Sequence, residues 1–487
     1  MPAAALYGEG MTELTLPLVA GSSLTVGDTY DNVDPADGSV LGRVARSGAE
    51  EVDRAVRAAA QAQPAWAATP TEQRADALTR LAALVDRDRE QLARTESQDT
   101  GKPLSQARAD ATVAARYFRY YGRVLEAAYG DTIPLGPDTH VYTRREPYGV
   151  VGSIVAWNYP LQLASRSIAA ATATGNAVVL KPADETPRTA VALAGLAMEA
   201  GLPAGVVNVV PGLGAEAGAA LTAHPQVAHL GFVGSTQTGR QVAHAAAERV
   251  VPAVLELGGK SAHVVFPDAD LDTAAEAITR SILQNAGQTC SAGSRLVVHT
   301  DVRAELVAAV ADRFRATTLG AGLDDPDLGP LVSLRQQERV RGYVEGASSG
   351  DVVVGGSAPP PDGALAGGAF WLPTLIDGVD PRDPIAQEEV FGPVLVTLPF
   401  EDEAQALALA NGTAYGLIAA LWTRDLSRAH RLAGALEAGQ VFVNTFGAGG
   451  GVELPFGGVK ASGYGREKGI EALAGFTHTK TVVVRLT

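Results

Sequence analysis

Apolar residues in the first quarter of the chain recur at intervals of three and four positions. Between residues 50 and 127, Ala, Leu and Val keep this spacing while Glu, Asp and Arg fill the positions between them. Such spacing gathers the apolar side chains on one face of an α-helix. We therefore expect amphipathic helices in the segments "AEEVDRAVRAAAQAQPAW" and "TEQRADALTRLAALVDRDREQLART".

From about residue 149 the pattern changes to short runs rich in β-branched residues, separated by helical segments. The runs are "GVVGSIVAW", "GNAVVLKP", "GVVNVVPG", "VAHLGFVGS" and "PAVLELGGK". Strands that alternate with helices at this pace indicate a parallel sheet with helices on its faces. The fold class that we predict is α/β.

A second series of strands and helices follows "AHVVFPDADLD" and includes "RLVVHT", "VRAELVAAVADRFRA", "VLVTLPF", "AALWT" and "QVFVN". It predicts a second α/β domain. The tail "HTKTVVVRLT" is a single strand that needs a host sheet. The sheet of its own domain and the edge of a partner subunit are both candidate hosts.

Length and charge narrow the class of protein. A chain of 487 residues exceeds one ordinary core, so we expect two or three domains. Hydrophobic residues make up 46% and charged residues 19%, which is typical of globular proteins. The net charge of −15 argues against nucleic acid and anionic membranes as partners, and favours small-molecule chemistry.

The N-terminus has no basic start and no long apolar run, so it is not a secretory signal. No apolar run is long enough to span a bilayer. We expect a cytoplasmic protein. Met11 is an alternative start to Met1, and the sequence does not decide between them.

Cys290, the only cysteine in the chain, lies in "QNAGQTCSAGSR". A free cysteine is most often a buried structural residue. However, the neighbouring Gly287, Thr289, Ser291 and Gly293 are small, and such neighbours leave room for a substrate to approach the thiol. Since a reactive thiol needs exposure and polar surroundings, a structural and a nucleophilic role both fit this segment.

Two polar residues occur at the ends of apolar strands. Glu256 lies within "LELGGK", and burial there raises the pKa of a carboxyl group, which suits a general base. Hydrogen bonding of this carboxylate to loop amides is the structural alternative. Asn158 follows a strand in "AWNYPLQ" and fits either a turn or an amide donor to an oxyanion.

Two further segments carry candidate ligand contacts. In "GFVGSTQTGRQVA", Gly234, Ser235 and Gly239 lead from a strand into a helix, whose free amides attract phosphate, although the spacing matches neither a P-loop nor GxGxxG. In "LKPADETP", Lys181 ends a strand and Asp184 follows three residues later. Both can hold ribose hydroxyls, since ligands bind at strand carboxyl ends, or they can form a solvated surface pair.

Taken in order, these motifs resemble the aldehyde dehydrogenase superfamily over roughly residues 20–485. The matching segments are "WNYP", "KPADETP", "GFVGST", "LELGGK", "GQTC", "EEVFGPV" and "PFGGVKASGYGRE". Seven collinear motifs make a chance match implausible. The resemblance implies an oxidoreductase that converts an aldehyde to a carboxylic acid with NAD(P)+ and without a metal.

The resemblance also implies a role for each matching residue. Cys290 is similar to the nucleophile of the family, Glu256 to its general base and Asn158 to the side-chain donor of its oxyanion hole. Glu467 matches an acid that some members use in proton relay. The residues that match the cofactor site are Trp157, Lys181, Asp184, Gly234, Ser235, Gly239, Leu257, Glu389 and Phe391.

The mechanism implied is covalent. The Cys290 thiolate attacks the aldehyde carbon, the thiohemiacetal passes hydride to the nicotinamide, and water activated by Glu256 hydrolyses the thioester. The implied fold has two Rossmann-type parallel-sheet domains and a small β-element for assembly into homodimers or homotetramers. The implied bounds are 1–124 with 146–258 for the NAD-binding domain, 259–461 for the catalytic domain, and 125–145 with 470–487 for the oligomerisation element.

Two residues depart from the common family pattern. Asp184 stands where the family often has Glu, and an acid there repels a 2′-phosphate, so we expect NAD, with NADP as an alternative because Asp is shorter. Arg166 stands where many aliphatic-aldehyde enzymes have an aromatic residue. It either pairs with a nearby acid or meets the substrate, which would then be a semialdehyde or a polar aromatic aldehyde. Gln284 is Arg in some succinic semialdehyde enzymes, so a two-arginine clamp is not evident.

Other classes remain as alternatives. A CoA-acylating dehydrogenase of the same fold would pass the acyl group to a thiol, but Glu256 favours hydrolysis. A non-catalytic binding or structural protein would not need Cys290, Glu256, Asn158 and Glu389 together. A cysteine hydrolase would need a histidine partner, and none of the eight histidines lies in a motif around Cys290.

Overall fold

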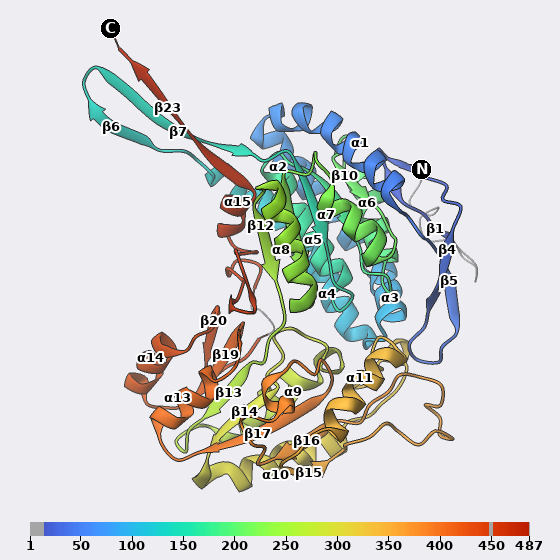
Figure 1. The fold of residues 1–487 in the computed structure, drawn as a ribbon, viewed down its shortest axis with the longest axis vertical. Helices are drawn as coiled ribbons and strands as arrows, with labels where there is room; N and C mark the ends of the chain where they lie inside the picture. Colours follow the sequence, from blue (N-terminus) through green and yellow to red (C-terminus); the bar gives the residue numbers. More distant parts are fainter. Residues whose placement is uncertain (1–13, 448–450, 487) are drawn as a thin grey trace.

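Figure 1 shows the computed structural model, which describes residues 14–447 and 451–486. The candidate start at Met11 lies outside these residues. No helix within the described ranges is both long enough and apolar enough to cross a membrane. A small three-stranded sheet opens the described chain, in a region where the sequence pattern predicted no element. Its strands, in spatial order, are β1 (Leu14–Thr15), β5 (Val40–Ala45) and β4 (Thr29–Val33).

An eight-stranded sheet forms the centre of the larger part of the molecule, and its five middle strands are parallel. These strands, in spatial order, are β12 (Ala253–Glu256), β11 (His229–Val233), β8 (Val150–Ile154), β9 (Ala177–Lys181) and β10 (Val207–Val209). The other three pair antiparallel, and they are β22 (Gly463–Tyr464) beside β12, and β2 (Leu18–Val19) with β3 (Ser22–Ser23) beyond β10. The five parallel strands are the five runs that the sequence pattern indicated.

Helices cover both faces of this sheet. Successive side chains of a strand point to opposite faces, so Val178 and Leu180 of β9 join one core while Ala177 and Val179 join the other. The first core contains residues of α2 (Thr71–Arg87), α3 (Arg89–Thr100), α4 (Leu104–Val124), α5 (Pro160–Ala173) and α6 (Arg188–Glu199). The second contains residues of α1 (Ala49–Ala68), α7 (Ala219–Ala223) and α8 (Thr236–Arg249). This layering confirms the predicted α/β class.

A seven-stranded sheet forms the second part of the molecule, at the bottom of Figure 1. Its order is β15 (Asp351–Val354), β16 (Thr374–Asp377), β17 (Val394–Phe400), β14 (Arg295–His299), β13 (Ala262–Val265), β19 (Ile418–Trp422) and β20 (Gln440–Val443). All neighbours are parallel except β15 and β16. The helices packed with it include α9 (Leu271–Leu283), α10 (Thr300–Ala316), α11 (Leu334–Glu345), α13 (Glu403–Asn411) and α14 (Leu426–Ala435).

The chain passes between the two large sheets beside Glu256. It leaves the first sheet at the end of β12, crosses through Gly258 and Gly259, and returns at β22. The returning strand pairs with the departing one, and Gly463 lies opposite Glu256. The Glu256 carboxylate is therefore fixed at the junction of the two parts.

A separate three-stranded sheet projects from the body as an arm, with the C-terminal strand in it (Figure 1). β23 (Thr477–Arg485) pairs along its full length with β7 (Thr139–Pro147), which also pairs with β6 (Thr132–Gly136). The C-terminal segment thus joins neither large sheet, although the sheet of its own domain was one of the two hosts considered. Its host is a separate hairpin of the same chain.

Candidate active site

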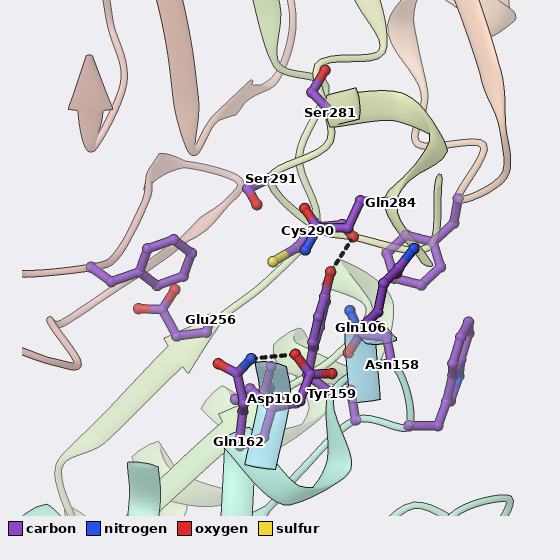
Figure 2. A pocket seen from close by; sticks show the side chains of 18 of the residues that line it. Gln106, Asp110, Asn158, Tyr159, Gln162, Glu256, Ser281, Gln284, Cys290 and Ser291 are labelled. Carbon is purple, nitrogen blue, oxygen red and sulfur yellow. Dashed lines mark hydrogen bonds between the residues drawn. The ribbon is translucent and has the colours of Figure 1, made fainter. Parts of the chain in front are cut away.

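One cavity of about 780 Å³ collects most of the residues that the sequence singled out. It is lined by the loops that follow β8 and β11, by the end of β12, and by segments of the second part of the molecule. Figure 2 shows Cys290, Glu256 and Asn158 around this space. The predicted site residues in its lining are Trp157, Asn158, Arg166, Gly234, Ser235, Glu256, Leu257, Cys290, Glu389 and Phe391. The predicted residues outside the lining are Lys181, Asp184, Gly239 and Glu467.

A tight turn presents Cys290 to the cavity. Asn285, Ala286 and Gly287 all have positive φ, at 50°, 53° and 71°, so the chain reverses sharply after α9. A Cβ at Gly287 would lie 2.0 Å from the carbonyl oxygen of Gly392, so only glycine fits there. Cys290 itself is neither fully buried nor fully exposed. The turn holds the backbone rigidly and leaves the thiol facing open space.

Asn158 is bonded to the same turn. Its Nδ2 group donates a hydrogen bond to the Gln288 carbonyl oxygen at 3.0 Å, two residues before the thiol. The backbone carbonyl oxygen of Asn158 accepts hydrogen bonds from Lys102 Nζ at 2.9 Å and from Asn285 Nδ2 at 2.8 Å. A side-chain amide has two N–H donors, so one remains for a group bound in the cavity. The arrangement fits an oxyanion donor whose position is fixed relative to Cys290.

Glu256 is a buried acid that accepts no hydrogen bond from the residues that the structure describes. Its side chain is 3% exposed, and neither carboxylate oxygen has a bonding partner. Burial raises the pKa of Glu256 well above its usual value, and the nearby Glu467 raises it further, while Arg166 and Lys468 oppose the rise. Such a carboxyl group is expected to bond to water and to take up a proton at a higher pH than an exposed glutamate does.

The thiol of Cys290 is held protonated by its surroundings. Burial raises its pKa to about 12, and the negative charges of Glu389 and Glu256 act in the same direction. Arg166 and Lys468 act in the opposite direction. Formation of a thiolate in this cavity therefore depends on positive charge close to the sulfur.

The carboxyl ends of β9 and β11 carry the candidate dinucleotide contacts. Lys181 and Asp184 form an ion pair, and the Gly214 amide lies 3.4 Å from Asp184 Oδ2. Ser235 caps α8, since its Oγ accepts a hydrogen bond from the Thr238 backbone amide at 3.2 Å. The remaining first-turn amides of this 14-residue helix, with its dipole, suit a phosphate group.

Gly239 and Gly234 keep side chains away from this helix start. A Cβ at Gly239 would lie 2.4 Å from the Leu257 side chain, so Gly239 allows α8 to pack closely on the end of β12. A Cβ at Gly234 would lie 2.6 Å from the Phe232 ring. Both glycines thus have a packing role, and Gly234 also lines the cavity.

Glu389 and Phe391 approach the cavity from the second part of the molecule. Glu389 accepts a hydrogen bond from the Gly259 amide at 3.0 Å, and burial raises its pKa to about 7. Phe391 adopts a positive φ of 61° and lies edge-on to the Trp157 ring, with ring centres 5.2 Å apart. These groups suit the ribose and the flat base of a nucleotide.

Among the described residues, no group of three or more His, Cys, Asp or Glu side chains could hold a metal ion.

Comparison with known proteins agrees with this geometry. The model of the aldehyde dehydrogenase family matches residues 23–482. The chain belongs to the aldehyde dehydrogenase family.

Solved structures of the family superpose closely on the chain. A putative aldehyde dehydrogenase from Burkholderia cenocepacia is 47% identical, with a TM-score of 0.94 over 97% of this chain and 100% of that one. The NAD+ complex of an aldehyde dehydrogenase from Bacillus cereus is 39% identical, with a TM-score of 0.96 over 100% and 99%. A mutant of the indole-3-acetaldehyde dehydrogenase AldA from P. syringae, in complex with NAD+ and IAA, is 37% identical, with a TM-score of 0.94 over 97% and 96%.

Arg166, the residue that departs from many members of the family, forms an ion pair with Glu467. Both side chains are buried, and the Arg166 guanidinium lies 5.5 Å from the centre of the Phe456 ring. Pairing with an acid was one of the two interpretations of Arg166. The other required contact with a substrate, and Arg166 also lines the cavity. The ion pair therefore brings Glu467 close to the site, although Glu467 is not in the lining.

A buried charge cluster that the sequence did not predict lies behind Asn158. Lys102 forms ion pairs with Glu96 and Asp110, and its ammonium group lies 4.3 Å from the centre of the Tyr159 ring. Although burial disfavours its charged form, the two acids raise the pKa of Lys102. All three charged residues occur in helical or loop segments whose sequence is typical of a solvent-exposed surface. Only their burial in the structure indicates that they position Asn158.

Proposed function

We propose that this protein is an NAD-dependent aldehyde dehydrogenase that hydrolyses its acyl-enzyme to a carboxylic acid. The observation that carries the proposal is the position of Glu256, a buried carboxyl group without a hydrogen-bond partner among the described residues, on the cavity that contains Cys290. A buried acid of this kind lowers stability, and such a cost is typical of functional sites. Water activation is the function that fits a raised carboxyl pKa beside a nucleophile.

Cys290 begins the reaction by attacking the aldehyde carbon. The sulfur forms a bond to carbon, and the carbonyl oxygen becomes an oxyanion. The free N–H of the Asn158 amide and the backbone amide of Cys290 are the donors that would stabilise this charge. One such donor contributes roughly 3–4 kcal/mol to a reaction of this type.

Glu256 acts in the second half of the reaction. As a carboxylate it accepts a proton from water, and the resulting hydroxide equivalent attacks the thioester carbon on Cys290. The C–S bond breaks, the acid leaves, and the thiolate is regenerated. The rate of this step falls as pH drops below the raised pKa of Glu256, because the protonated carboxyl group cannot accept a proton.

NAD is the cofactor that the binding residues fit. Its oxidised nicotinamide, when bound, supplies the acceptor for the hydride of the aldehyde. The Lys181–Asp184 pair suits the adenine ribose, the start of α8 suits the pyrophosphate, and Glu389 suits the nicotinamide ribose. The relatives from B. cereus and P. syringae that were solved as NAD+ complexes support this assignment. The Asp184 carboxylate disfavours the extra phosphate of NADP.

For the substrate we propose an aromatic aldehyde or a semialdehyde. The cavity wall around Cys290 combines aromatic rings with polar side chains, and it includes Gln106, Tyr117, Tyr159, Gln162, Gln284, Phe446 and Phe456. Rings can stack on an aromatic substrate, whereas the amides and Arg166 can bind a polar group at its far end. The P. syringae relative is named for indole-3-acetaldehyde, an aromatic aldehyde.

We further propose that residues 1–124 with 146–258 bind NAD, that 259–461 carry the nucleophile, and that 125–145 with 470–487 mediate assembly into a homodimer or homotetramer. Exposed apolar side chains on the arm support this assembly. They are Ile133, Leu135, Val483, Val484 and Leu486.

The test is NADH formation from NAD with a panel of short aliphatic, aromatic and carboxylated aldehydes, with and without CoA. We expect NADH without CoA, fastest with aromatic or carboxylated aldehydes, and none from Cys290→Ser. Strict dependence on CoA would instead identify an acylating dehydrogenase. Undiminished NADH formation by the serine variant would contradict the proposed function.

Arg166→Lys and Arg166→Ala test the substrate class. If Arg166 contacts the far end of the substrate, the alanine variant should lose turnover of carboxylated aldehydes more than turnover of aliphatic ones. The lysine variant should retain part of the preference because it keeps the charge. An unchanged ratio in both variants would show that Arg166 serves only its ion pair with Glu467.

A further inference from the structure

Four ionisable side chains are buried together beside Cys290. Arg166, Glu256, Glu467 and Lys468 are 5%, 3%, 3% and 6% exposed. Burial of charged groups is costly, and a set of this size is retained where a function requires it. The proposed reaction uses only Glu256 from this set. Lys468 is the member for which neither the reaction nor the family motifs quoted above supply a role.

The position of Lys468 is fixed by both its backbone and its side chain. Its φ is 63°, a left-handed conformation that lysine seldom adopts, and it precedes Gly469, whose φ is 59°. Its ammonium group lies 4.7 Å from the centre of the Phe456 ring, and the Arg166 guanidinium lies 5.5 Å from the same ring. The Lys468 side chain lines the cavity together with Cys290.

The charges that face the thiol come from four segments of the chain. Glu389, before β17, and Glu256, at the end of β12, disfavour a thiolate, whereas Arg166 and Lys468 favour it. Arg166 also forms an ion pair with Glu467, so the negative charge of Glu467 offsets part of the effect of Arg166 on the thiol. The other titratable groups that act on this cluster are Tyr117 of α4, Tyr159 at the start of α5 and Arg466.

We propose that the ammonium group of Lys468 stabilises the thiolate of Cys290 before the cofactor binds, so that Lys468 is a positioning residue for the nucleophile. Ionisation breaks the S–H bond and releases the proton to solvent, and the negative charge on sulfur is compensated by Lys468. No bond forms between the two residues. The inference rests on the proposed function only in taking Cys290 as the nucleophile.

The two groups are expected to charge together. Burial and the repulsion of Arg166 lower the pKa of Lys468 to about 7, while the negative charges of Cys290, Glu256 and Glu467 raise it. Lys468 is therefore charged below neutral pH and loses its proton as the pH rises, but a thiolate beside it delays that loss. Because the pKa of the thiol is far higher, only a minor fraction of Cys290 is ionised at neutral pH, and Lys468 increases that fraction while it is charged.

The experiment is the rate of iodoacetamide alkylation of the cofactor-free enzyme as a function of pH. Cys290 is the only cysteine, so every alkylation event reports on this thiol. In Lys468→Met and Lys468→Gln we expect alkylation below neutral pH to be about tenfold slower than in the wild type, since loss of a neighbouring opposite charge shifts a thiol pKa by at least about one unit. The difference should disappear well above neutral pH, where Lys468 of the wild type is uncharged.

Two variants serve as controls. Lys468→Arg keeps a positive charge at all relevant pH values, so it should restore alkylation to at least the wild-type rate. Arg280→Met removes a cation that also lines the cavity but is exposed to solvent, which screens its charge, so the thiol pKa should not change. Thermal unfolding establishes that each variant is folded, and the glutamine variant retains polarity if methionine is not tolerated.

A wild-type alkylation profile in the neutral Lys468 variants would overturn the proposal, as would an arginine variant that behaves like the neutral ones. A uniform fall in rate at every pH, without a shift in the apparent pKa, would identify a structural role and would also overturn it. Alkylation needs neither aldehyde nor NAD. Failure of the wild-type protein to form NADH would therefore count against the proposed function alone.

Discussion

Burial sets the protonation states of single residues in the cavity. Glu256 and Cys290 both have raised pKa values because the surrounding protein disfavours their charged forms, and Glu389 is affected in the same way. The cations Arg166 and Lys468 counteract this effect without abolishing it. The chemical state of each group is thus set by a balance between burial and a few neighbouring charges.

Glu256→Gln should separate stability from activity. Burial gives Glu256 a higher pKa in the folded than in the unfolded state, so its contribution to stability is full below the unfolded value of about 4.3 and is lost as the pH rises. The amide cannot ionise, so we expect a melting temperature a few degrees above wild type at neutral pH and no difference near pH 4. Calorimetry at the two pH values measures this.

The same variant should release one equivalent of NADH per active site and then stall, with kcat lower by roughly 100-fold or more, because the acyl-enzyme is not hydrolysed. Glu401→Gln, at an exposed position, should match the wild type in both experiments. Normal steady-state turnover by Glu256→Gln would contradict its role as the base.

Individual elements position these residues, and the turn after α9 shows how. Three consecutive residues with positive φ end the helix and bring Gln288 and Cys290 against the loop that carries Asn158. The proposed oxyanion donor and the proposed nucleophile follow strands of different sheets, and a hydrogen bond between their loops fixes their spacing. Small changes in this turn should therefore affect both residues.

Gly287→Ala tests that dependence. The added Cβ would lie 2.0 Å from the backbone oxygen of Gly392, which cannot rotate away, and the positive φ adds strain. We expect the free energy of unfolding to fall by more than about 2 kcal/mol and kcat to fall with it. Gly342→Ala is the control, since Gly342 is in α11 with open space around it, and alanine there should stabilise by roughly 0.5–1 kcal/mol. Equal stability of the two variants would contradict the prediction.

The segment between β9 and α6 should set the choice of dinucleotide. Asp184→Ala removes the carboxylate that would repel a 2′-phosphate, so the ratio of kcat/KM for NAD to that for NADP should fall roughly tenfold, the effect of one charge near a protein surface. Steady-state assays with both cofactors measure this ratio. A wild-type enzyme that already prefers NADP would contradict the assignment.

The whole molecule combines two sheet-based parts with an arm that has little core of its own. β6, β7 and β23 form a three-stranded sheet whose apolar side chains, such as Leu135 and Val483, are 69% and 62% exposed. Exposed apolar surface on a projecting sheet is typical of an interface between protein chains. A second copy of the chain is the partner that we propose.

Leu135→Asp combined with Val483→Asp should therefore weaken assembly. Burial of two carboxylates in an apolar interface is unfavourable, so the mass in solution should fall from that of a dimer or tetramer to that of a smaller species. Light scattering coupled to size-exclusion chromatography measures this change. Leu426→Asp, at another exposed leucine on α14, is the control and should leave the mass unchanged. Loss of mass in the control alone would place the interface elsewhere.

The sequence alone determined the fold class and supplied the candidate reactive groups. Alternation of β-branched runs with helical segments predicted parallel sheets, because strand and helix periodicities are local properties of the chain. Cys290 was singled out because it is the only thiol in the chain. Glu256 and Asn158 were singled out because each is a polar residue within or directly after an apolar strand. The C-terminal strand was predicted without a unique host, since a strand does not encode its partner.

Only the tertiary structure decided which charges act on one another. Glu467 meets Arg166 across some 300 residues of sequence, and Lys102 reaches Asn158 from the loop between α3 and α4. Periodicity within a segment cannot predict such contacts, because they depend on how whole elements pack. The raised pKa of Glu256 also depends on the tertiary structure, because it follows from burial. Burial cannot be deduced from the segment "LELGGK" that contains this residue.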